Sequence, residues 1–295
     1  MSLVEDTKAL LGDPANRIRL HDLVVGAVTD LLAATTEQLF PVSGKWSADE
    51  FKERLTRYEG ATADLRAVMA LLAYWGEPHH GQTLTLPVRR LAARTGEKSS
   101  GGIWVGLGWY PALLLVYAAG IAGVAAGKYG NLSTLLGTAV PLPARPGARG
   151  AFVLTLISGL SDNGDAFKSL PDYERRYTPR SDYLFKLMRA EFEGVLMAGM
   201  DYEACFDRWE VMLALEHAYR NSVEAGRQPW GPPGSFAWKQ FHREKDAPLA
   251  QVISEAEAQG GSWQPIEAGF FGGSIERFRE TASAYQRWVN GLGWH

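Results

Sequence analysis

The stretch from Ile103 to Ala126 constrains the fold of this chain more than any other part of the sequence. No residue between Lys98 and Lys128 is charged, so the stretch lies either in a protein core or in a lipid bilayer. Its length is sufficient to cross a bilayer, but Pro111 divides it and several glycines weaken a continuous helix. We therefore predict a buried central helix that is broken near Pro111, with a membrane span as the alternative.

Length, charge and cysteine content narrow the class of protein. A chain of 295 residues can form one domain of two lobes or two small domains. Its net charge of -3 provides no basic excess, so general nucleic-acid binding is not expected. The single cysteine, Cys205, excludes an internal disulfide and fits a reducing cytoplasm, and its neighbours Phe206 and Trp209 indicate a buried apolar position. The N-terminus shows no signal-peptide pattern, so the predicted location is the cytoplasm.

The N-terminal part has the apolar spacing of amphipathic helices. One helix is predicted over 13–40, and a capping box of Ser47 and Glu50 begins a second helix of about 25 residues. The short loop between them predicts an antiparallel hairpin. A third helix is predicted over 86–94, with Pro87 in its first turn, where a missing N–H is tolerated.

The turn GKYGN, residues 127–131, separates the uncharged stretch from another short apolar helix. It resembles the junction of tetratricopeptide-type helix pairs, in which an aromatic residue after a glycine packs back between two helices. No second copy recurs at a fixed period, so a repeat array is not predicted. The following stretch 141–150, PLPARPGARG, is predicted to be a linker between an N-terminal lobe, 1–140, and a C-terminal lobe, 151–295.

The C-terminal lobe also reads as helical. Strand-turn-strand alternation is not found in it or elsewhere. The expected fold is therefore all-α, an irregular helical bundle of two lobes with the tetratricopeptide-like helix pair at its centre. The predicted helices cover 151–160, start at Thr178-Pro179, run from Asp201 to Gly226 and from Pro248 to Gln259, and begin again at Ser274.

Few side chains suggest catalysis or metal binding. His79 and His80 are adjacent in a predicted loop, whereas Glu216 and His217 are adjacent on a predicted helix, where their side chains point about 100° apart. Neither pair has the spacing of a known metal motif, and no nucleophile elbow or phosphate-binding loop is present. No catalytic, cofactor-binding or metal-binding residue is assigned, and no cofactor is expected. An enzyme of unrecognised class, a hydrolase or nucleotidase that uses these residues between the lobes, is an alternative.

The segment QPWGPPGSFAWKQFH, residues 228–242, contains prolines together with aromatic side chains that would be exposed unless another surface covers them. Its proline-rich beginning cannot be helical, so the segment either lies across its own helices as a lid or forms a partner-binding surface. Arginines in the predicted linker are candidates for contact with an acidic partner. The candidate partner-binding residues are Trp230, Phe236, Trp238, Arg145 and Arg149.

Four pieces of the sequence together carry a resemblance to a known group of proteins. They are WYPALLLVYAAGIAGVAAGKYGNLSTLL, RRYTPRSDYLFKLM, FDRWEVMLALEHAYR and AEAQGGSWQPIEAGFFGGSIERFRE. They resemble the helical C-terminal regions of bacterial multidomain proteins that carry SIR2-like, AlbA/Schlafen-type or P-loop nucleotide-hydrolysing modules and are linked to phage defence. The resemblance carries no catalytic motif, so no functional residue is transferred from it.

The resemblance and the lack of a catalytic pattern predict a non-catalytic helical module that senses, scaffolds or regulates. Its expected partner is a protein, a separately encoded effector in a bacterial, antiphage-type system, and oligomers are compatible with the sequence. The enzyme described above is one alternative. A membrane-acting effector built on the uncharged stretch is the other.

Overall fold

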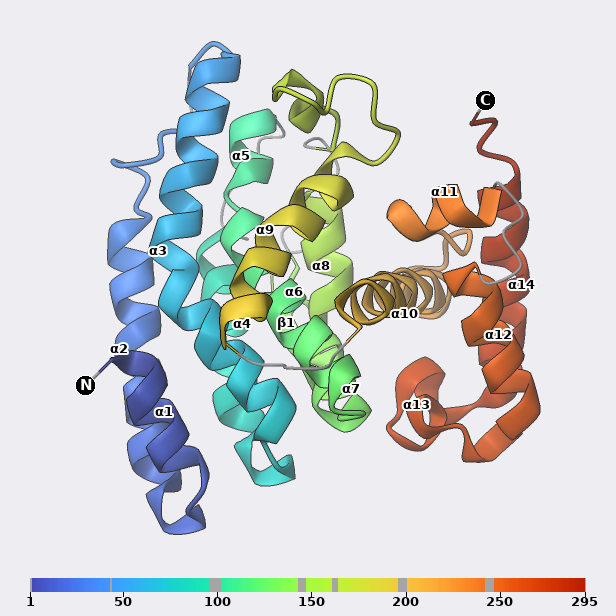
Figure 1. Cartoon of the computed structure of the whole chain (residues 1–295), viewed down its shortest axis with the longest axis horizontal. Coiled ribbons are helices and arrows are strands. Elements are labelled where there is room, and N and C mark those ends of the chain that lie inside the picture. The colour runs from blue at the N-terminus through green and yellow to red at the C-terminus, as the bar shows by residue number, and fades with distance from the viewer. Residues whose placement is uncertain are drawn as a thin grey trace. The chain divides into compact units, whose positions relative to one another are not determined.

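The computed structural model describes residues 2–42, 44–95, 102–142, 147–160, 164–195, 201–241 and 247–294. Within these residues the chain folds into helices and a single two-stranded antiparallel sheet (Figure 1). The fold is therefore all-α and irregular, as the sequence predicts. The chain forms two compact units, Met1–Glu174 and Arg175–His295, and each is described by itself.

In the first unit the long helix α3 packs most extensively against α6 and also contacts α1 and α2. The contact between α2 and α3 confirms the predicted helical hairpin. The elements of the first unit are α1 (Leu3–Leu11), the 3-10 helix η1 (Pro14–Asn16), α2 (Arg17–Ala34), α3 (Ala48–Trp75), η2 (Pro78–His80), α4 (Gly81–Thr95), α5 (Ile103–Leu107), α6 (Tyr110–Ala125), α7 (Tyr129–Gly137), β1 (Ala139–Pro141), β2 (Arg149–Ala151), α8 (Phe152–Gly159) and η4 (Asp165–Ser169).

Helix α6 is the core of this unit. Every residue of α6 up to Val124 is buried, and α3, α4 and α7 pack against it. Pro111 stands in its first turn, after a break between α5 and α6, so the predicted interruption is confirmed. Among the described residues, Ile103–Ala125 is the one stretch long and apolar enough to cross a membrane, and 89% of its most apolar window is buried within the protein. This is the behaviour of the core helix of a soluble protein.

The GKYGN turn connects α6 to α7 and contacts the end of α3. A Cβ atom on Gly123 of α6 would lie 2.6 Å from Cδ2 of Leu132 on α7, so the glycine permits the close packing that the sequence predicts. The side-chain amide of Asn131 donates hydrogen bonds to the carbonyl oxygens of Gly76 (2.9 Å) and Ala73 (3.2 Å). These carbonyls end α3 and have no partner within the helix, so Asn131 satisfies them.

Helix α4 begins earlier than predicted. The segment expected to be a loop contains the 3-10 helix η2, which runs directly into α4, and Pro87 therefore lies inside the helix rather than in its first turn. The cause is a capping box, in which the ring Nδ1 of His80 accepts the backbone N–H of Glu77 at 3.0 Å. The sequence shows Glu77 and His80 at this spacing, but histidine is an unusual residue for the second position of the box.

The predicted linker 141–150 falls inside the first unit, and the two units divide only after Glu174. Strand β1 pairs with β2 across this stretch, with Val140 opposite Gly150. This short strand pair was not predicted from the sequence. Each strand has three residues, too few to show an alternating pattern in the sequence. Residues 143–146 lie outside the described residues.

The second unit is arranged around helix α10, which contacts α9, α11, α12 and α14 (Figure 1). Two predicted caps are confirmed, because Asp201 accepts the N–H of Ala204 and Ser274 accepts the N–H of Arg277. The elements of the second unit are α9 (Pro179–Val195), α10 (Tyr202–Val223), α11 (Ser235–Phe241), α12 (Pro248–Gln259), η5 (Gly260–Ser262), α13 (Gln264–Glu267), η6 (Phe270–Gly273) and α14 (Ile275–Asn290).

Candidate functional site

Glu216, one of the residues considered for catalysis, is fully buried in α10 and has structural partners for both of its carboxylate oxygens. Arg220 donates to Oε1 at 2.6 Å, and the backbone N–H of Phe271 donates to Oε2 at 2.9 Å. Phe271 has a left-handed backbone (φ 54°), which is unfavourable for a residue with a side chain. Burial raises the pKa of Glu216, and the charge of Arg220 opposes that rise. Glu216 thus holds the turn at Phe271 in place.

His217, its neighbour, is also buried. Its Nδ1 atom lies 2.7 Å from the carbonyl oxygen of Trp230, and the two rings meet edge to face. A carbonyl oxygen can only accept, so Nδ1 carries the proton. Burial lowers the pKa of His217 to about 4, and the imidazole is therefore neutral near pH 7.

The two other histidines considered for catalysis or metal binding lie at η2 in the first unit. Their rings are 3.9 Å apart, but His79 is exposed and His80 is buried in the capping box with Glu77. Burial lowers the pKa of His80. Within the described residues, no group of three or more His, Cys, Asp or Glu side chains could hold a metal ion.

Cys205 is half-buried rather than enclosed. Burial, together with the charge of Asp201, raises the pKa of its thiol to about 11. The thiol is therefore protonated near pH 7 and is a poor nucleophile. The predicted burial is therefore only partial, while the raised pKa of the thiol agrees with a structural rather than a reactive cysteine.

One side of α10 contacts a returning segment of the same unit in a regular order. We call residues 228–239 the return segment and the five facing residues of α10, spaced three and four apart, the α10 stripe. The spacing places the stripe on one face of the helix. The paired residues are Asn221 with Gln228, His217 with Trp230, Ala214 with Gly231, Glu210 with Gly234 and Ser235, and Asp207 with Ser235 and Lys239.

The return segment lies directly on α10 because two of its residues are glycine. A Cβ atom on Gly231 would lie 2.2 Å from the carbonyl oxygen of Ala214, and one on Gly234 would lie 2.1 Å from a carboxylate oxygen of Glu210. At Gly231 the close atom belongs to the backbone, so any other residue would move the return segment away from the helix; at Gly234 the carboxylate of Glu210 would have to shift.

Buried acidic groups fix the beginning of α11. The hydroxyl of Ser181 donates to Oε2 of Glu210 at 2.8 Å and accepts the backbone N–H of Ser235 at 2.9 Å. Lys239, one turn further along α11, lies 2.5 Å from Oδ2 of Asp207. Burial raises the pKa of Asp207, while the hydrogen bond and charge of Lys239 lower it. Helix α11 is thus bound to α10 through hydrogen bonds at Ser235 and Lys239.

The predicted partner-binding residues differ in their surroundings. Phe236 is fully buried, and Trp230 is half-buried with its ring 6.1 Å from that of Trp288. The return segment therefore covers its own helices, as one of the two interpretations predicts. Arg149 is exposed and donates to the carbonyl oxygen of Ala139 at 2.6 Å, and Arg145 lies outside the described residues.

Trp238 belongs to an aromatic stack that includes an exposed residue. The ring of Tyr177, which is 44% exposed, stacks on Trp238 with centroids 5.1 Å apart and on Trp294 with centroids 5.3 Å apart. We call these three residues the aromatic stack. Sequence reasoning identified only Trp238, because Tyr177 and Trp294 come from distant parts of the chain and no local pattern connects them.

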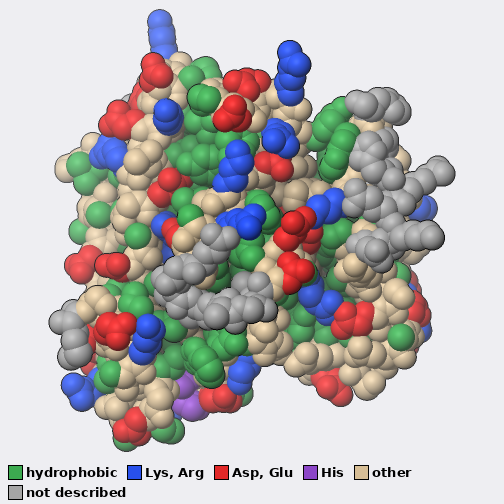
Figure 2. Space-filling model, in the orientation of Figure 1, with side chains coloured by type: hydrophobic (Ala, Val, Ile, Leu, Met, Phe, Trp, Pro, Cys, Tyr) green, Lys and Arg blue, Asp and Glu red, His purple; other side chains and the backbone are tan. Residues whose placement is uncertain are grey.

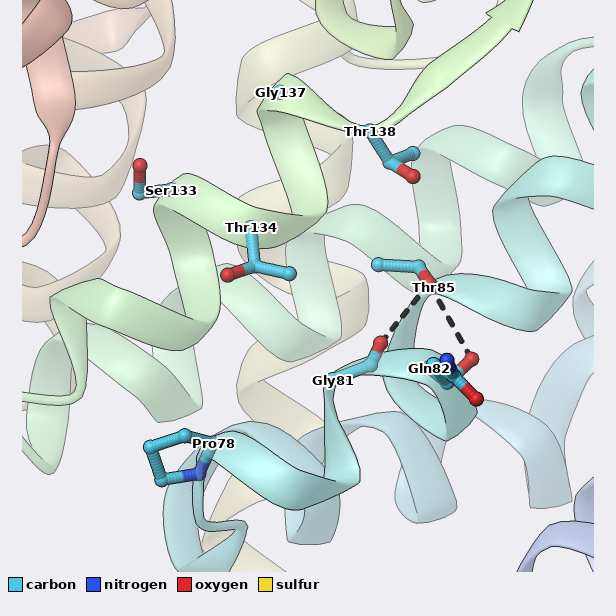
Figure 3. Close-up of a pocket in the computed structure, with 8 residues that line it drawn as sticks. All are labelled: Pro78, Gly81, Gln82, Thr85, Ser133, Thr134, Gly137 and Thr138. Atoms are coloured by element: carbon cyan, nitrogen blue, oxygen red, sulfur yellow. Dashed lines mark hydrogen bonds between the residues drawn. The ribbon is translucent and has the colours of Figure 1, made fainter.

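The first unit contains an open depression of about 470 Å³ between α4 and α7 (Figure 3). Thr85 turns its hydroxyl toward the carbonyl oxygens of Gly81 (2.9 Å) and Gln82 (3.3 Å), so this hydroxyl is already satisfied. The depression is also lined by Pro78, Ser133, Thr134, Gly137 and Thr138, and none of the lining side chains is charged. The depression is uncharged, with polar and apolar surface in similar amounts, and sequence reasoning did not identify it.

Charged groups of both signs are interspersed with hydrophobic side chains on the face shown in Figure 2. This distribution agrees with the net charge of -3. Comparison with known proteins finds no matching family model, and no curated protein or solved structure matches the chain. The sites are therefore interpreted from their own geometry.

Proposed function

We propose that the chain is a non-catalytic helical module that binds a partner protein, and that the aromatic stack is a contact surface for this partner. The partner that we propose is a separately encoded effector in a bacterial, antiphage-type system. The resemblance of the helical segments to regions of defence-associated proteins motivates this part of the proposal. The cytoplasm is the proposed location.

The observation that carries the proposal is the exposure of Tyr177 within the aromatic stack. Aromatic side chains are enriched at the energetic centres of protein interfaces, where large apolar surface is buried at low entropic cost. Tyr177 is 44% exposed while Trp238 and Trp294 fix the plane of its ring. A partner that covers this ring gains apolar burial without having to order the side chain.

The residues considered for an enzymatic site support the same proposal. Glu216, His217 and His80 each hold a backbone element of the chain through a hydrogen bond. Their present contacts give them a structural role. The proposal therefore rests on the aromatic stack, in which the exposed ring of Tyr177 contacts two other rings.

Co-expression of the gene with its neighbouring genes tests the proposal. We expect one neighbour-encoded protein to co-elute with the chain in size-exclusion chromatography with light scattering. Replacement of Tyr177 by Ala should weaken this complex by about 30-fold or more, which corresponds to the loss of a central aromatic contact of about 2 kcal/mol.

The matched control is Trp75→Ala, which removes an aromatic residue that is 61% exposed on the first unit. This change should leave the complex intact. A chain that retains no neighbour-encoded protein at low salt, or a complex that is insensitive to Tyr177→Ala, would contradict the proposal.

A further inference from the structure

The first part of the return segment, residues 228–234 with the sequence QPWGPPG, has the chemistry of an extended peptide ligand. Three of these seven residues, Pro229, Pro232 and Pro233, are proline, which fixes φ near -65°. A residue that precedes proline is also restricted to extended conformations. The segment has no regular secondary structure, and its backbone is stiff before it makes any contact.

The surface beneath this segment recognises its backbone at every second residue. The side chains of Asn221 and His217 on α10 donate to the carbonyl oxygens of Gln228 (2.9 Å) and Trp230 (2.7 Å). The hydroxyl of Tyr285 on α14 donates to the carbonyl oxygen of Pro232 at 3.1 Å. The three donors thus form a ladder along an extended chain. Such contacts depend on the backbone and tolerate different side chains between the contacted residues.

Aromatic rings and one glycine position add specificity to the ladder. The rings of Tyr285 and Trp288 lie 5.5 Å apart on α14, and Trp288 meets Trp230 edge to face. Proline rings suit such surfaces, and proline has no N–H that burial would leave without a partner. Gly231 lies where a Cβ atom would meet the backbone of α10. The close approach at Gly231 therefore selects glycine at that position, and the other contacts are compatible with proline at the neighbouring positions.

We propose that the surface formed by Asn221, His217, Ala214, Tyr285 and Trp288 is a recognition groove for an extended proline- and glycine-containing segment of a partner protein. Residues 228–234 occupy this groove in cis and act as an autoinhibitory ligand. None of the groove residues belongs to the aromatic stack, and the groove does not require the proposed function of that stack. Binding in trans requires the chain's own segment to leave, so the intact chain binds such a partner weakly.

A labelled synthetic peptide of residues 227–235, RQPWGPPGS, tests the groove in fluorescence anisotropy. The receptor is the full chain with Gly231→Val, in which the new side chain prevents residues 228–234 from lying on α10. We expect this variant to bind the peptide saturably and at least about tenfold more tightly than the unmodified chain, because competition in cis is removed. A peptide with valine at the position of Gly231 should not bind.

The full chain with both Pro232→Ala and Pro233→Ala serves as a second receptor with a milder change. It is used if the Gly231→Val chain no longer shows the circular dichroism spectrum of a helical protein. These changes loosen the cis segment through its flexibility and leave the groove unaltered. A folded receptor that binds neither peptide, or binds both equally, overturns the proposal, as does equal binding by the unmodified chain. Tyr177→Ala should leave peptide binding unchanged, so failure of the groove and failure of the aromatic stack are distinguishable.

Discussion

Helices α6 and α10 are the central helices of their units, but they are buried in different ways. Helix α6 is buried almost along its whole length by apolar and small side chains, and the sequence around it is uncharged. Helix α10 buries Asp207, Glu210, Glu216 and His217. An apolar side chain needs only to be surrounded, whereas a buried charge needs a partner at one particular place. The two helices should therefore respond differently to substitution.

A charge in α6 should have the largest effect. Leu114 is fully buried, and Leu114→Asp places a carboxylate where no partner is available along the helix. We expect a loss of more than about 4 kcal/mol in the free energy of unfolding, enough to unfold the chain. Circular dichroism during thermal unfolding measures this. Val223→Asp, at a position that is 61% exposed on α10, should change stability by no more than about 0.5 kcal/mol. A cooperative melt of Leu114→Asp at the original temperature would show that α6 is not the core.

Removal of one partner of a buried pair in α10 should have the next largest effect. Glu216→Ala leaves Arg220 without its buried partner and the N–H of Phe271 without its acceptor. The expected cost is about 3 kcal/mol in urea unfolding. The control Glu224→Ala removes the more exposed partner of Arg220 and should cost less than about 1 kcal/mol.

A double variant tests the same pair in the opposite direction. Glu216→Met with Arg220→Met removes both charges and should recover part of the stability that the single change loses, since no buried charge is left unpaired. The loss in the free energy of unfolding is measured for Glu216→Met, for Arg220→Met and for the double variant. If the double variant loses more than the sum of the two single losses, the pairing of charges does not explain burial in α10.

This contrast explains how much of the fold could be predicted from the sequence. The uncharged run that contains α6, the break near Pro111 and the caps at Asp201 and Ser274 are local patterns, and the structure confirms them. The strand pair around 141–150 was missed because three residues are too few to show alternation. The early start of α4 was missed because its capping box uses His80.

The candidate sites could be predicted only in part. Glu216 and Arg220 are four residues apart, a spacing that favours pairing on a helix, but this pairing was not predicted. The contact of His217 with Trp230 and the stacking of Tyr177 with Trp294 join separate segments, and no sequence period specifies them. The segment 228–242 suggested a lid or a surface. The contacts show that its first part is a lid, and the role of Trp238 as a partner contact stays a prediction.

The pH dependence of stability should reveal the neutral histidine of α10. His217 has a pKa of about 4 in the folded chain, against an ordinary value of 6.5, so the unfolded chain binds more protons between these pH values. Stability is therefore lost as the pH falls through this window. The contribution of His217 should be about 2 kcal/mol between pH 7 and pH 5.

Urea unfolding of the unmodified chain and of His217→Gln at both pH values isolates this contribution. Glutamine can still donate to the carbonyl oxygen of Trp230 but does not titrate. Asp207 and Glu216 have raised pKa values and act in the opposite direction in both proteins, so they cancel in the difference. An identical pH dependence in the two proteins would mean that His217 is not neutral and buried.

The smallest expected effect concerns the close packing of α6 against α7. In Gly123→Ala the new methyl group would meet Cδ2 of Leu132 at 2.6 Å, so the leucine must shift, whereas at Gly130 nothing lies within 4 Å. Gly123→Ala should cost about 1 kcal/mol after the higher helix propensity of alanine is counted. Gly130→Ala should be neutral or stabilising by up to about 0.5 kcal/mol, because only the propensity changes. Urea unfolding measures both variants. Equal responses would mean that α6 is buried by its apolar composition alone, with no contribution from the close fit at Gly123.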